Sequence, residues 1–352
     1  MNAILNNEKA LQAIRRVNQA IEDIKQGKMV VMVDDEDREN EGDLVYAASF
    51  SSPQKVNFMA SHAKGLICVA LSKAIAHRLK LEPMCSKNDS SYETAFTISV
   101  DARTATTGIS ASERDMTIKI LAEPTSSASE LVRPGHIFPL IAKDGGTLVR
   151  IGHTEGSVDL CSLSGLSESA VICEIIKEDG TMARRADLDI FCQKHDINIV
   201  YISDIVEYRM MKESLIKSVS ESTEEFMGCS VKKYTFEDHL SRKHTAYLFG
   251  EASEHCAVKF HNIMPDNELL SHAKKYNHLL KSIAYLNLHG GLLIFMSSSD
   301  AQNMSQVREY GIGAQIIKYF GIDKIELLSD SEIKEFVGIT GFELEVAKFI
   351  RL

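Results

Sequence analysis

The spacing of hydrophobic residues divides the first part of the chain into alternating helical and extended segments. Leu11, Ile14, Val17, Ile21 and Ile24 recur at helical spacing and predict an amphipathic first helix. Short β-branched runs predict strands at 28–33, 43–48, 66–71, 96–100, 147–151 and 198–202, and helical patterns occupy 53–63, 112–121, 167–176 and 184–194. The expected fold is α+β, with a mixed sheet and helices on both of its faces.

The composition changes between residues 211 and 225, where Lys, Ser and Glu replace large apolar residues. Such a shift is typical of an interdomain connection. We therefore expect a first domain over residues 1–210, a linker over 211–225 and a second, smaller α/β domain over 226–352. The second domain is expected to contain a strand at 291–296 and a helix at 313–320.

Charge and composition exclude several classes of protein. The net charge is −10, whereas proteins that bind nucleic acid usually present a basic face. No apolar run approaches the roughly 20 residues that span a bilayer, and the first residues contain no signal-peptide core. Seven cysteines without a C-x-x-C pair favour free thiols in a reducing compartment. We expect a cytoplasmic protein that binds neither membrane nor nucleic acid.

Residues 34–43 contain seven carboxylates in ten positions, between two predicted strands. Their mutual repulsion is unfavourable unless a cation lies among them, and hard oxygen ligands suit Mg²⁺. If the segment is extended, Glu39, Glu41 and Asp43 project to one side. A solvated acidic turn is the alternative, since most charge runs are simply exposed surface.

Residues 150–155 (RIGHTE) combine side chains that suit a phosphate beside a metal ion. The guanidinium of Arg150 can bind two phosphate oxygens, Thr154 adds a hydroxyl donor, and His153 can bind a metal. Gly152 provides flexibility between them. The alternative for His153 is a hydrogen-bonded, partly buried histidine without a ligand.

Two further residues are candidates for proton transfer. His136 lies in a sequence rich in turn residues (RPGH), which places it in or beside a loop. Glu174 lies in an apolar segment, so its carboxylate must be paired or have a raised pKa; a structural ion pair is the alternative. Residues 106–110 (TTGIS) form either a small anion-binding nest or an ordinary turn.

Five separated blocks, DDEDRENEGDL (34–44), TTGISASER (106–114), RPGHIFPL (133–140), RIGHTE (150–155) and DGTMAR (179–184), resemble the 3,4-dihydroxy-2-butanone 4-phosphate synthase family. The resemblance covers roughly residues 8–209. It implies a lyase of riboflavin biosynthesis that converts D-ribulose 5-phosphate to 3,4-dihydroxy-2-butanone 4-phosphate and formate. It also implies Mg²⁺ or Mn²⁺ as cofactor and a homodimer.

The resemblance assigns roles by position. Glu39 and His153 correspond to the metal ligands, and His136 and Glu174 to the essential catalytic pair, with Glu41 as a further base. The substrate-binding positions are Arg38, Glu39, Asp43, Arg150, Gly152, His153, Thr154 and Glu174. We expect residues 34–37 to shape the loop without direct chemistry.

The second half resembles GTP cyclohydrolase II, most clearly at 308–315 and at 337–342, but its zinc ligands are missing. That family binds zinc through three cysteines, whereas the matching stretch here is 261–264 (HNIM), with Lys275 and Asn277 near the later cysteine positions. Arg308 is retained as the arginine nucleophile, and Gln306 replaces the neighbouring acid. We therefore expect a domain without zinc that is inactive as a GTP cyclohydrolase.

Three other interpretations differ in class. The chain can be a bifunctional enzyme that retains some GTP binding or GTP cyclohydrolase activity. It can instead be a regulatory binding protein in which both halves are degenerate, although the occupied positions 39, 153 and 174 count against this. A nucleic-acid-binding first domain is the most remote, since the chain lacks a basic face.

Overall fold

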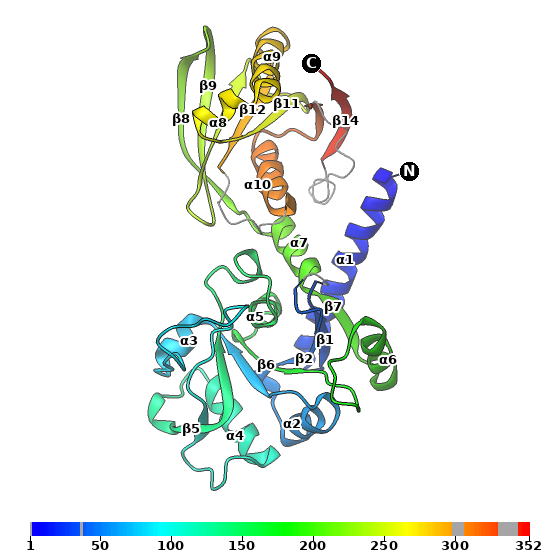
Figure 1. Ribbon diagram of the computed structural model, residues 1–352, viewed down its shortest axis with the longest axis vertical. Coiled ribbons are helices and arrows are strands. Elements are labelled where there is room, and N and C mark those ends of the chain that lie inside the picture. The colour runs from blue at the N-terminus through cyan, green and yellow to red at the C-terminus, as the bar shows by residue number, and fades with distance from the viewer. Residues whose placement is uncertain (1, 36–37, 298–305, 330–343) are drawn as a thin grey trace. The chain divides into compact units, whose positions relative to one another are not determined.

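The computed structural model describes residues 2–35, 38–297, 306–329 and 344–352 (Figure 1). They form two compact units, one over Gln12–Tyr208 and one over Arg209–Leu352 together with Met1–Leu11. Each unit contains its own seven-stranded sheet. The expected fold class, a mixed sheet with helices followed by a second α/β domain, is confirmed.

The first unit is built on a mixed sheet with the strand order β4-β5-β3-β6-β2-β1-β7. Its strands are β1 (Val30–Val33), β2 (Gly42–Ala47), β3 (Cys68–Leu71), β4 (Val100–Ala102), β5 (Leu131–Ile141), β6 (Ser169–Glu174) and β7 (Asn198–Tyr201). Its helices are α1 (Asn2–Lys25), α2 (Pro53–Phe58), α3 (Lys73–Arg78), α4 (Ala111–Ala122), α5 (His153–Leu163), α6 (Arg185–His195) and α7 (Ile202–Lys212), with α1 and α7 continuing into the second unit. Short helices are η1 (Ala48–Phe50), η2 (Met59–Ala63), η3 (Ala128–Glu130) and η4 (Gly146–Leu148).

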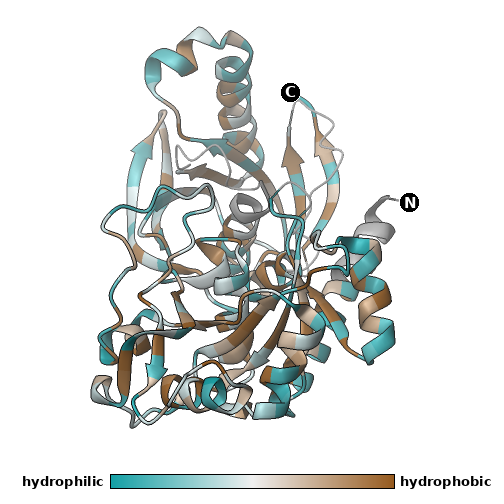
Figure 2. Cartoon of the chain, turned by 60° about the horizontal axis from the view of Figure 1, so that its bottom comes forward, coloured by the Kyte–Doolittle hydropathy of each residue, from teal (hydrophilic) through white to brown (hydrophobic). Residues whose placement is uncertain are grey.

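Helices cover both faces of this sheet because successive strand residues point to opposite sides. On one face Val17 of α1, Leu160 of α5 and Ile205 of α7 pack with Val45 of β2. On the other face α2, α4 and α6 pack against the alternate residues of the same strands. Figure 2 shows hydrophobic stretches along the strands and hydrophilic stretches on the helices.

Four predictions in the first unit were wrong. Residues 96–100, expected as a strand, form only isolated bridges at Phe96 and Thr97, and β4 begins at Val100. Residues 167–176, expected as a helix, form strand β6, because a short apolar run does not distinguish the two and its Val and Ile residues favour a strand. Residues 147–151, expected as a strand, form the end of η4 and a loop. His136, expected in or beside a loop, lies within β5, which continues through the Pro-Gly sequence.

The second unit has the strand order β14-β13-β11-β12-β10-β9-β8. Its strands are β8 (Ile216–Phe226), β9 (Cys229–Asp238), β10 (Lys243–Phe249), β11 (His255–Asn262), β12 (Gly291–Met296), β13 (Lys324–Leu328) and β14 (Glu345–Ile350). Its helices are α8 (Asp266–Ser271), α9 (Ala273–His289) and α10 (Gln306–Tyr319). The strand expected at 291–296 is confirmed.

The segment expected as a linker has regular structure. Most of residues 211–225 belong to β8, which pairs with β9 along its length. β8 is an edge strand and most of its side chains are exposed. Exposed edge strands are often polar, so the composition of this strand resembles that of a linker.

Two further observations concern the cysteines and the absence of membrane-spanning helices among the described residues. All seven cysteines are free, as expected; Cys85 is exposed, and Cys68, Cys161, Cys173 and Cys256 are buried. Within the described residues, no helix has the length and hydropathy needed to cross a membrane.

Candidate active site

The candidate site begins at a pair of carboxylates that face each other across the sheet. Asp43 of β2 lies directly opposite Glu174 of β6. Both side chains point to the face covered by α5, since Val45 and Ile172, two residues away on each strand, are in that core. Two like charges at this spacing are destabilising, and burial with these neighbours raises the pKa of Asp43 to about 7. The pair therefore favours a proton or a cation beside it.

The loop between β1 and β2 is shaped by the carboxylate of Asp34, whose side chain is fully buried. It accepts hydrogen bonds from the Arg38 guanidinium (2.8 Å), the Glu39 amide (3.0 Å) and the Glu41 amide (2.8 Å). These contacts are those of a residue that shapes the loop. Glu36 and Asp37, which were assigned the same role, lie outside the described residues.

An extended loop would project Glu39, Glu41 and Asp43 to one side, but the loop is not extended. Residues 38–39 form a turn and Asn40 has a left-handed backbone with φ of 53°. Glu39 and Glu41 nevertheless remain close enough to Asp43 to raise its pKa. The turn thus gathers these carboxylates by a different backbone path.

His153 faces the acidic loop from the first residue of α5. Its Nδ1 atom lies 3.5 Å from Oε2 of Glu39, and one ligand atom each from Asp34, Glu39 and His153 lie within 4.8 Å of one another. Burial alone would lower the pKa of His153, but the nearby carboxylates of Asp43, Glu39 and Asp34 raise it to about 9. Among the described residues, the buried Nε2 atom of His153 and Oδ1 of Asp43 have no hydrogen-bond partner.

Beside His153, the start of α5 has no side-chain cap. The N-cap residue, Gly152, has no side chain to satisfy the first amides of this helix, so they can bind a negatively charged group. Arg150 lies next to it and pairs with Glu155, and Thr154 is buried in the first turn. A Cβ atom at residue 152 would overlap the Arg150 guanidinium, so a larger residue here would require the Arg150 side chain to move.

Arg38 and Arg150 are connected through Tyr92. The Tyr92 hydroxyl donates to the Arg38 carbonyl (2.8 Å), and the Arg38 guanidinium lies 5.0 Å from the centre of the Tyr92 ring. Arg150 donates to the Tyr92 carbonyl at 2.8 Å. The loop containing Tyr92 thus contacts both arginines that were expected to bind substrate.

His136 and Glu174 lie on the two strands that flank β3. Phe138 pairs with Cys68, and Cys68 pairs with Ile172, so the register places His136 and Glu174 at the same end of the sheet. Their backbones are about 10 Å apart at the usual strand spacing. Oε2 of Glu174 accepts a hydrogen bond from the Leu66 amide (2.9 Å), and Nδ1 of His136 lies 2.7 Å from Oδ2 of Asp101.

The small-residue loop at 106–110 binds a carboxylate of its own chain. Glu113 accepts hydrogen bonds from the amides and hydroxyls of Thr106 and Thr107 and from the hydroxyl of Ser110. These bonds, the largest contribution coming from Thr106, lower the pKa of Glu113 to about 2. Of the two alternatives left open for this loop, the contacts fit a turn whose donors are occupied by Glu113.

Sequence reasoning missed three residues that contact the site. Arg184 of the DGTMAR block donates to the carbonyls of Glu39 and Asn40, at 2.7 Å for Glu39, and so holds the acidic loop. Asp101 and Tyr92 lie outside the five blocks. The sequence pointed only to Arg184, because it lies in the DGTMAR block, whose residues had not been given a role.

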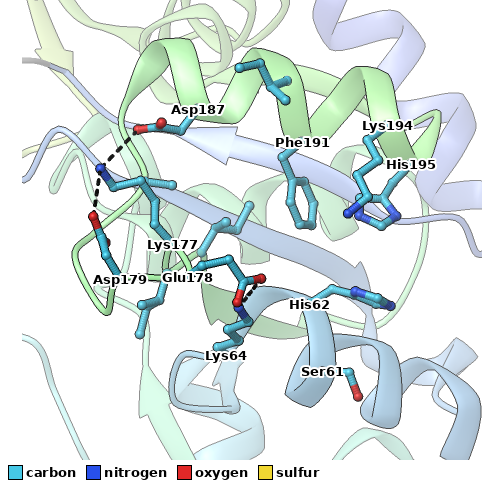
Figure 3. A pocket seen from close by; sticks show the side chains of 14 residues that line it. Ser61, His62, Lys64, Lys177, Glu178, Asp179, Asp187, Phe191, Lys194 and His195 are labelled. Carbon is cyan, nitrogen blue, oxygen red and sulfur yellow. Dashed lines mark ion pairs between the residues drawn. The ribbon is translucent and has the colours of Figure 1, made fainter.

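The pocket in Figure 3 is separate from this site. It lies between η2 and α6 and has a volume of about 440 Å³. Ile175, Ala183 and Phe191 line it and belong to the core on the opposite face of the sheet from Asp43 and Glu174. Its lysines 64 and 177 are paired with acidic neighbours.

The second unit does not bring its cysteines together. Cys229 begins β9 and Cys256 lies in β11, and strands β10 and β12 separate them. His261 lies near the end of β11, where burial and then Lys259 and Lys275 lower its pKa. The predicted motif at 337–342 lies outside the described residues, as does the side chain of Arg308.

Two family models match the chain, one in each unit. The family model of 3,4-dihydroxy-2-butanone 4-phosphate synthase matches residues 18–208, and that of GTP cyclohydrolase II matches residues 269–351. A 3,4-dihydroxy-2-butanone 4-phosphate synthase of Sulfurospirillum multivorans is 74% identical over 348 residues, which cover 99% of this chain and 98% of the relative.

Two solved structures are also similar. RibBX, a two-domain 3,4-dihydroxy-2-butanone 4-phosphate synthase from A. baumannii, has a TM-score of 0.80 and 38% identity, covering 96% of this chain and 99% of that one. A 3,4-dihydroxy-2-butanone 4-phosphate synthase in complex with two magnesium ions has a TM-score of 0.54 and 36% identity, covering 56% of this chain and 97% of that one. The chain is therefore an enzyme that belongs to the 3,4-dihydroxy-2-butanone 4-phosphate synthase family.

Proposed function

We propose that the chain converts D-ribulose 5-phosphate to 3,4-dihydroxy-2-butanone 4-phosphate and formate in riboflavin biosynthesis. The observation that carries the proposal is the convergence of His153, Glu39, Asp43 and Glu174 beside the start of α5. A cation beside carboxylates and a phosphate at a helix N-terminus are what a phosphorylated ketose requires.

The residues of the site fit a divalent metal ion. Glu39 and His153 would hold it, since His153 presents a buried nitrogen that lacks a hydrogen-bond partner within the described residues. Carboxylate oxygens with one imidazole suit Mg²⁺ or Mn²⁺. The related synthase that binds two magnesium ions supports this assignment. A bound metal would stabilise negative charge that develops on adjacent sugar oxygens.

The phosphate would bind at the start of α5. The free amides of the first turn, the Thr154 hydroxyl and the Arg150 guanidinium together supply donors to several phosphate oxygens. Arg38 is held in the loop between β1 and β2 by its hydrogen bond to Asp34 (2.8 Å) and by its contact with the Tyr92 ring. Binding at these groups would orient the sugar toward Asp43 and Glu174.

The reaction requires removal of a proton next to a carbonyl, loss of water and release of formate. Asp43, with a pKa near 7, can hold or release a proton at neutral pH. Burial and the charge of Glu39 raise the pKa of Glu41, which makes it a further base. Glu174 and His136 would act from either side of the substrate, since β3 separates their strands.

The test is to incubate the purified protein with ribulose 5-phosphate and Mg²⁺ and to measure formate and the four-carbon phosphate. We expect activity that a chelator abolishes and that added Mg²⁺ or Mn²⁺ restores. Replacing Glu39 by Gln should remove it, whereas Asp189→Asn, on the exposed face of α6, should not. Activity that survives both the chelator and Glu39→Gln would contradict the proposal.

For the second unit we propose that it is inactive as a GTP cyclohydrolase and binds no zinc. Lys259 and Lys275 near His261 disfavour a second cation there, and Cys229 and Cys256 lie on separate strands. Retained GTP binding is the alternative. The protein incubated with GTP alone should release no formate, and metal analysis should find no stoichiometric zinc; either positive result would overturn this assignment.

We further propose that the chain acts as a cytoplasmic homodimer. The seven free thiols support a reducing compartment. Light scattering after size-exclusion chromatography would measure the mass of the assembly. A monomer at micromolar concentration with full activity would contradict the dimer.

A further inference from the structure

We propose that Asp101 is a positioning residue that fixes the tautomer and orientation of the His136 imidazole. This inference rests on the proposed function, because it takes His136 as a group that moves a proton. Asp101 lies in β4, outside every motif that suggested the activity.

Both oxygens of the Asp101 carboxylate contact the same histidine. Oδ1 accepts the backbone amide of His136 at 2.8 Å, and Oδ2 lies 2.7 Å from Nδ1 of its ring. The Asp101 side chain is 9% exposed, whereas the His136 side chain is 44% exposed. One edge of the ring is thus held by a buried carboxylate while the ring itself remains accessible.

This geometry determines which nitrogen is available. A carboxylate accepts hydrogen bonds, so Nδ1 carries the proton and Nε2 presents its lone pair. Nε2 can take one proton from the substrate and return it later. The Asp101 carboxylate accepts from Nδ1 before and after the transfer, and it stabilises the imidazolium that forms between the two transfers.

Two glycines allow the carboxylate to reach the ring. Gly108 has φ of 78°, and a Cβ atom there would overlap Oδ2 of Asp101 and lie 2.6 Å from Nδ1 of His136. A Cβ atom at Gly135 would overlap the carbonyl carbon of Val100. The residue before Asp101 is therefore in close backbone contact with the residue before His136.

The loop that carries Gly108 is itself fixed. Glu113 binds the amides of Thr106 and Thr107, and Ser110 caps the helix that contains Glu113. The TTGIS segment thus has a use that anion binding does not explain. It encloses the contact between Asp101 and His136.

The first experiment replaces Asp101 by Asn. In this variant the amide oxygen keeps the hydrogen bond from the His136 backbone amide, so the NH2 group faces Nδ1 and donates to it. The ring must then carry its proton on Nε2. We expect kcat for formate release to fall about 100-fold or more, with KM changed less than about threefold. Nitrogen-15 NMR of the imidazole should show the proton on Nδ1 in the unmodified protein and on Nε2 in the variant.

A second variant leaves both side chains, Asp101 and His136, chemically unchanged. Gly108→Ala places a methyl group against the carboxylate and should separate Asp101 from His136, with the same change in kcat and in the NMR signal. Asp115→Asn is the matched control, since Asp115 is a buried aspartate that pairs with Lys119 on α4. It should leave the His136 signal unchanged.

A double-mutant cycle with His136→Gln distinguishes a role in positioning the His136 ring from a general role in stabilising the fold. If Asp101 acts through His136, then Asp101→Asn should reduce kcat by less than about threefold in a His136→Gln background. An equal loss in both backgrounds, or an Nδ1 without a proton in the unmodified protein, would overturn the inference. Failure of the unmodified enzyme to release formate would instead contradict the proposed function, and the NMR result would still decide the pairing.

Discussion

The two sheets of this chain have the same number of strands but opposite electrostatics at their polar ends. In the first unit, carboxylates of Asp43, Glu174 and Glu39 meet around a single imidazole. In the second unit, two lysines lie near His261 at the end of β11: burial, the largest cause, and then Lys259 and Lys275 lower the pKa of His261.

The difference teaches that sheet architecture alone does not predict chemistry. A site for a divalent cation needs converging oxygen or thiolate ligands, and only the first unit brings such ligands together among the described residues. A site surrounded by lysines disfavours a metal ion. Substitutions in either unit test this contrast, and the largest effect is expected at Glu39 in the loop between β1 and β2.

Replacing Glu39 by Gln should abolish the function of the first unit. The change removes a negative ligand while keeping the shape of the side chain. We expect kcat to fall about 1,000-fold, the size of loss seen when one charge-stabilising group is removed from an active site. Formate release measures it. A loss below about tenfold would mean that Glu39 is not a metal ligand.

Replacing Glu174 by Gln should lower activity and raise stability together. We expect an approximately 100-fold loss of kcat if Glu174 transfers a proton. Removing the repulsion with Asp43 should stabilise the metal-free protein by roughly 0.5 kcal/mol. Calorimetry would detect the higher Tm. Glu178→Gln, in the exposed segment that follows β6, is the control and should change neither quantity.

The stability of the second unit should depend on Asp238, whose buried carboxylate pairs with Arg242 and His244. Burial opposes ionisation, but hydrogen bonds from these two residues lower the pKa of Asp238 below its value in an unfolded chain. Its stabilising contribution is therefore present above about pH 4 and is lost as the pH falls further.

Asp238→Asn should destabilise the second unit by about 2 kcal/mol at pH 7 and make its unfolding less dependent on pH in the acid range. Lyase activity below the unfolding temperature should change less than about twofold. Denaturant unfolding followed from about pH 3 to pH 7 measures the first effect. A loss of lyase activity in the folded variant would show that the two units do not function separately.

Magnesium should stabilise the first unit alone. A ligand that binds only the folded state at about ten times its Kd adds about 1.4 kcal/mol. Unfolding of the first unit should shift to higher temperature with Mg²⁺, and the shift should disappear in Glu39→Gln. A shift confined to the second unit would reverse the comparison between the two sheets.

Sequence patterns predicted the elements that carry strong periodicity. The first helix, the strands on either side of the acidic loop and the helix at 112–121 all have counterparts in the structure. The apolar run at 167–176 was assigned the wrong structure because it is buried among other strands and shows no alternation.

The candidate site was predictable only where its residues cluster along the chain. Glu39, Asp43 and His153 belong to dense polar blocks, so their residue types pointed to a metal and a phosphate. Asp101 lies 35 positions from His136, and only the pairing of β4 with β5 brings them together. An isolated aspartate in a short strand carries no local signal, so its contact required the fold.

The distribution of thiols has a practical consequence for spectroscopy. Burial raises the pKa of Cys161 to about 12 and that of Cys256 to about 11, so these sulfurs react slowly with alkylating reagents. Cys85 is exposed, and it lies in the same loop as Tyr92. A maleimide fluorophore attached to the natural sequence should therefore label this loop first, and Cys192→Ser with Cys229→Ser would remove the two thiols of intermediate exposure. Its emission would then report substrate binding at Arg38 and Arg150 in real time.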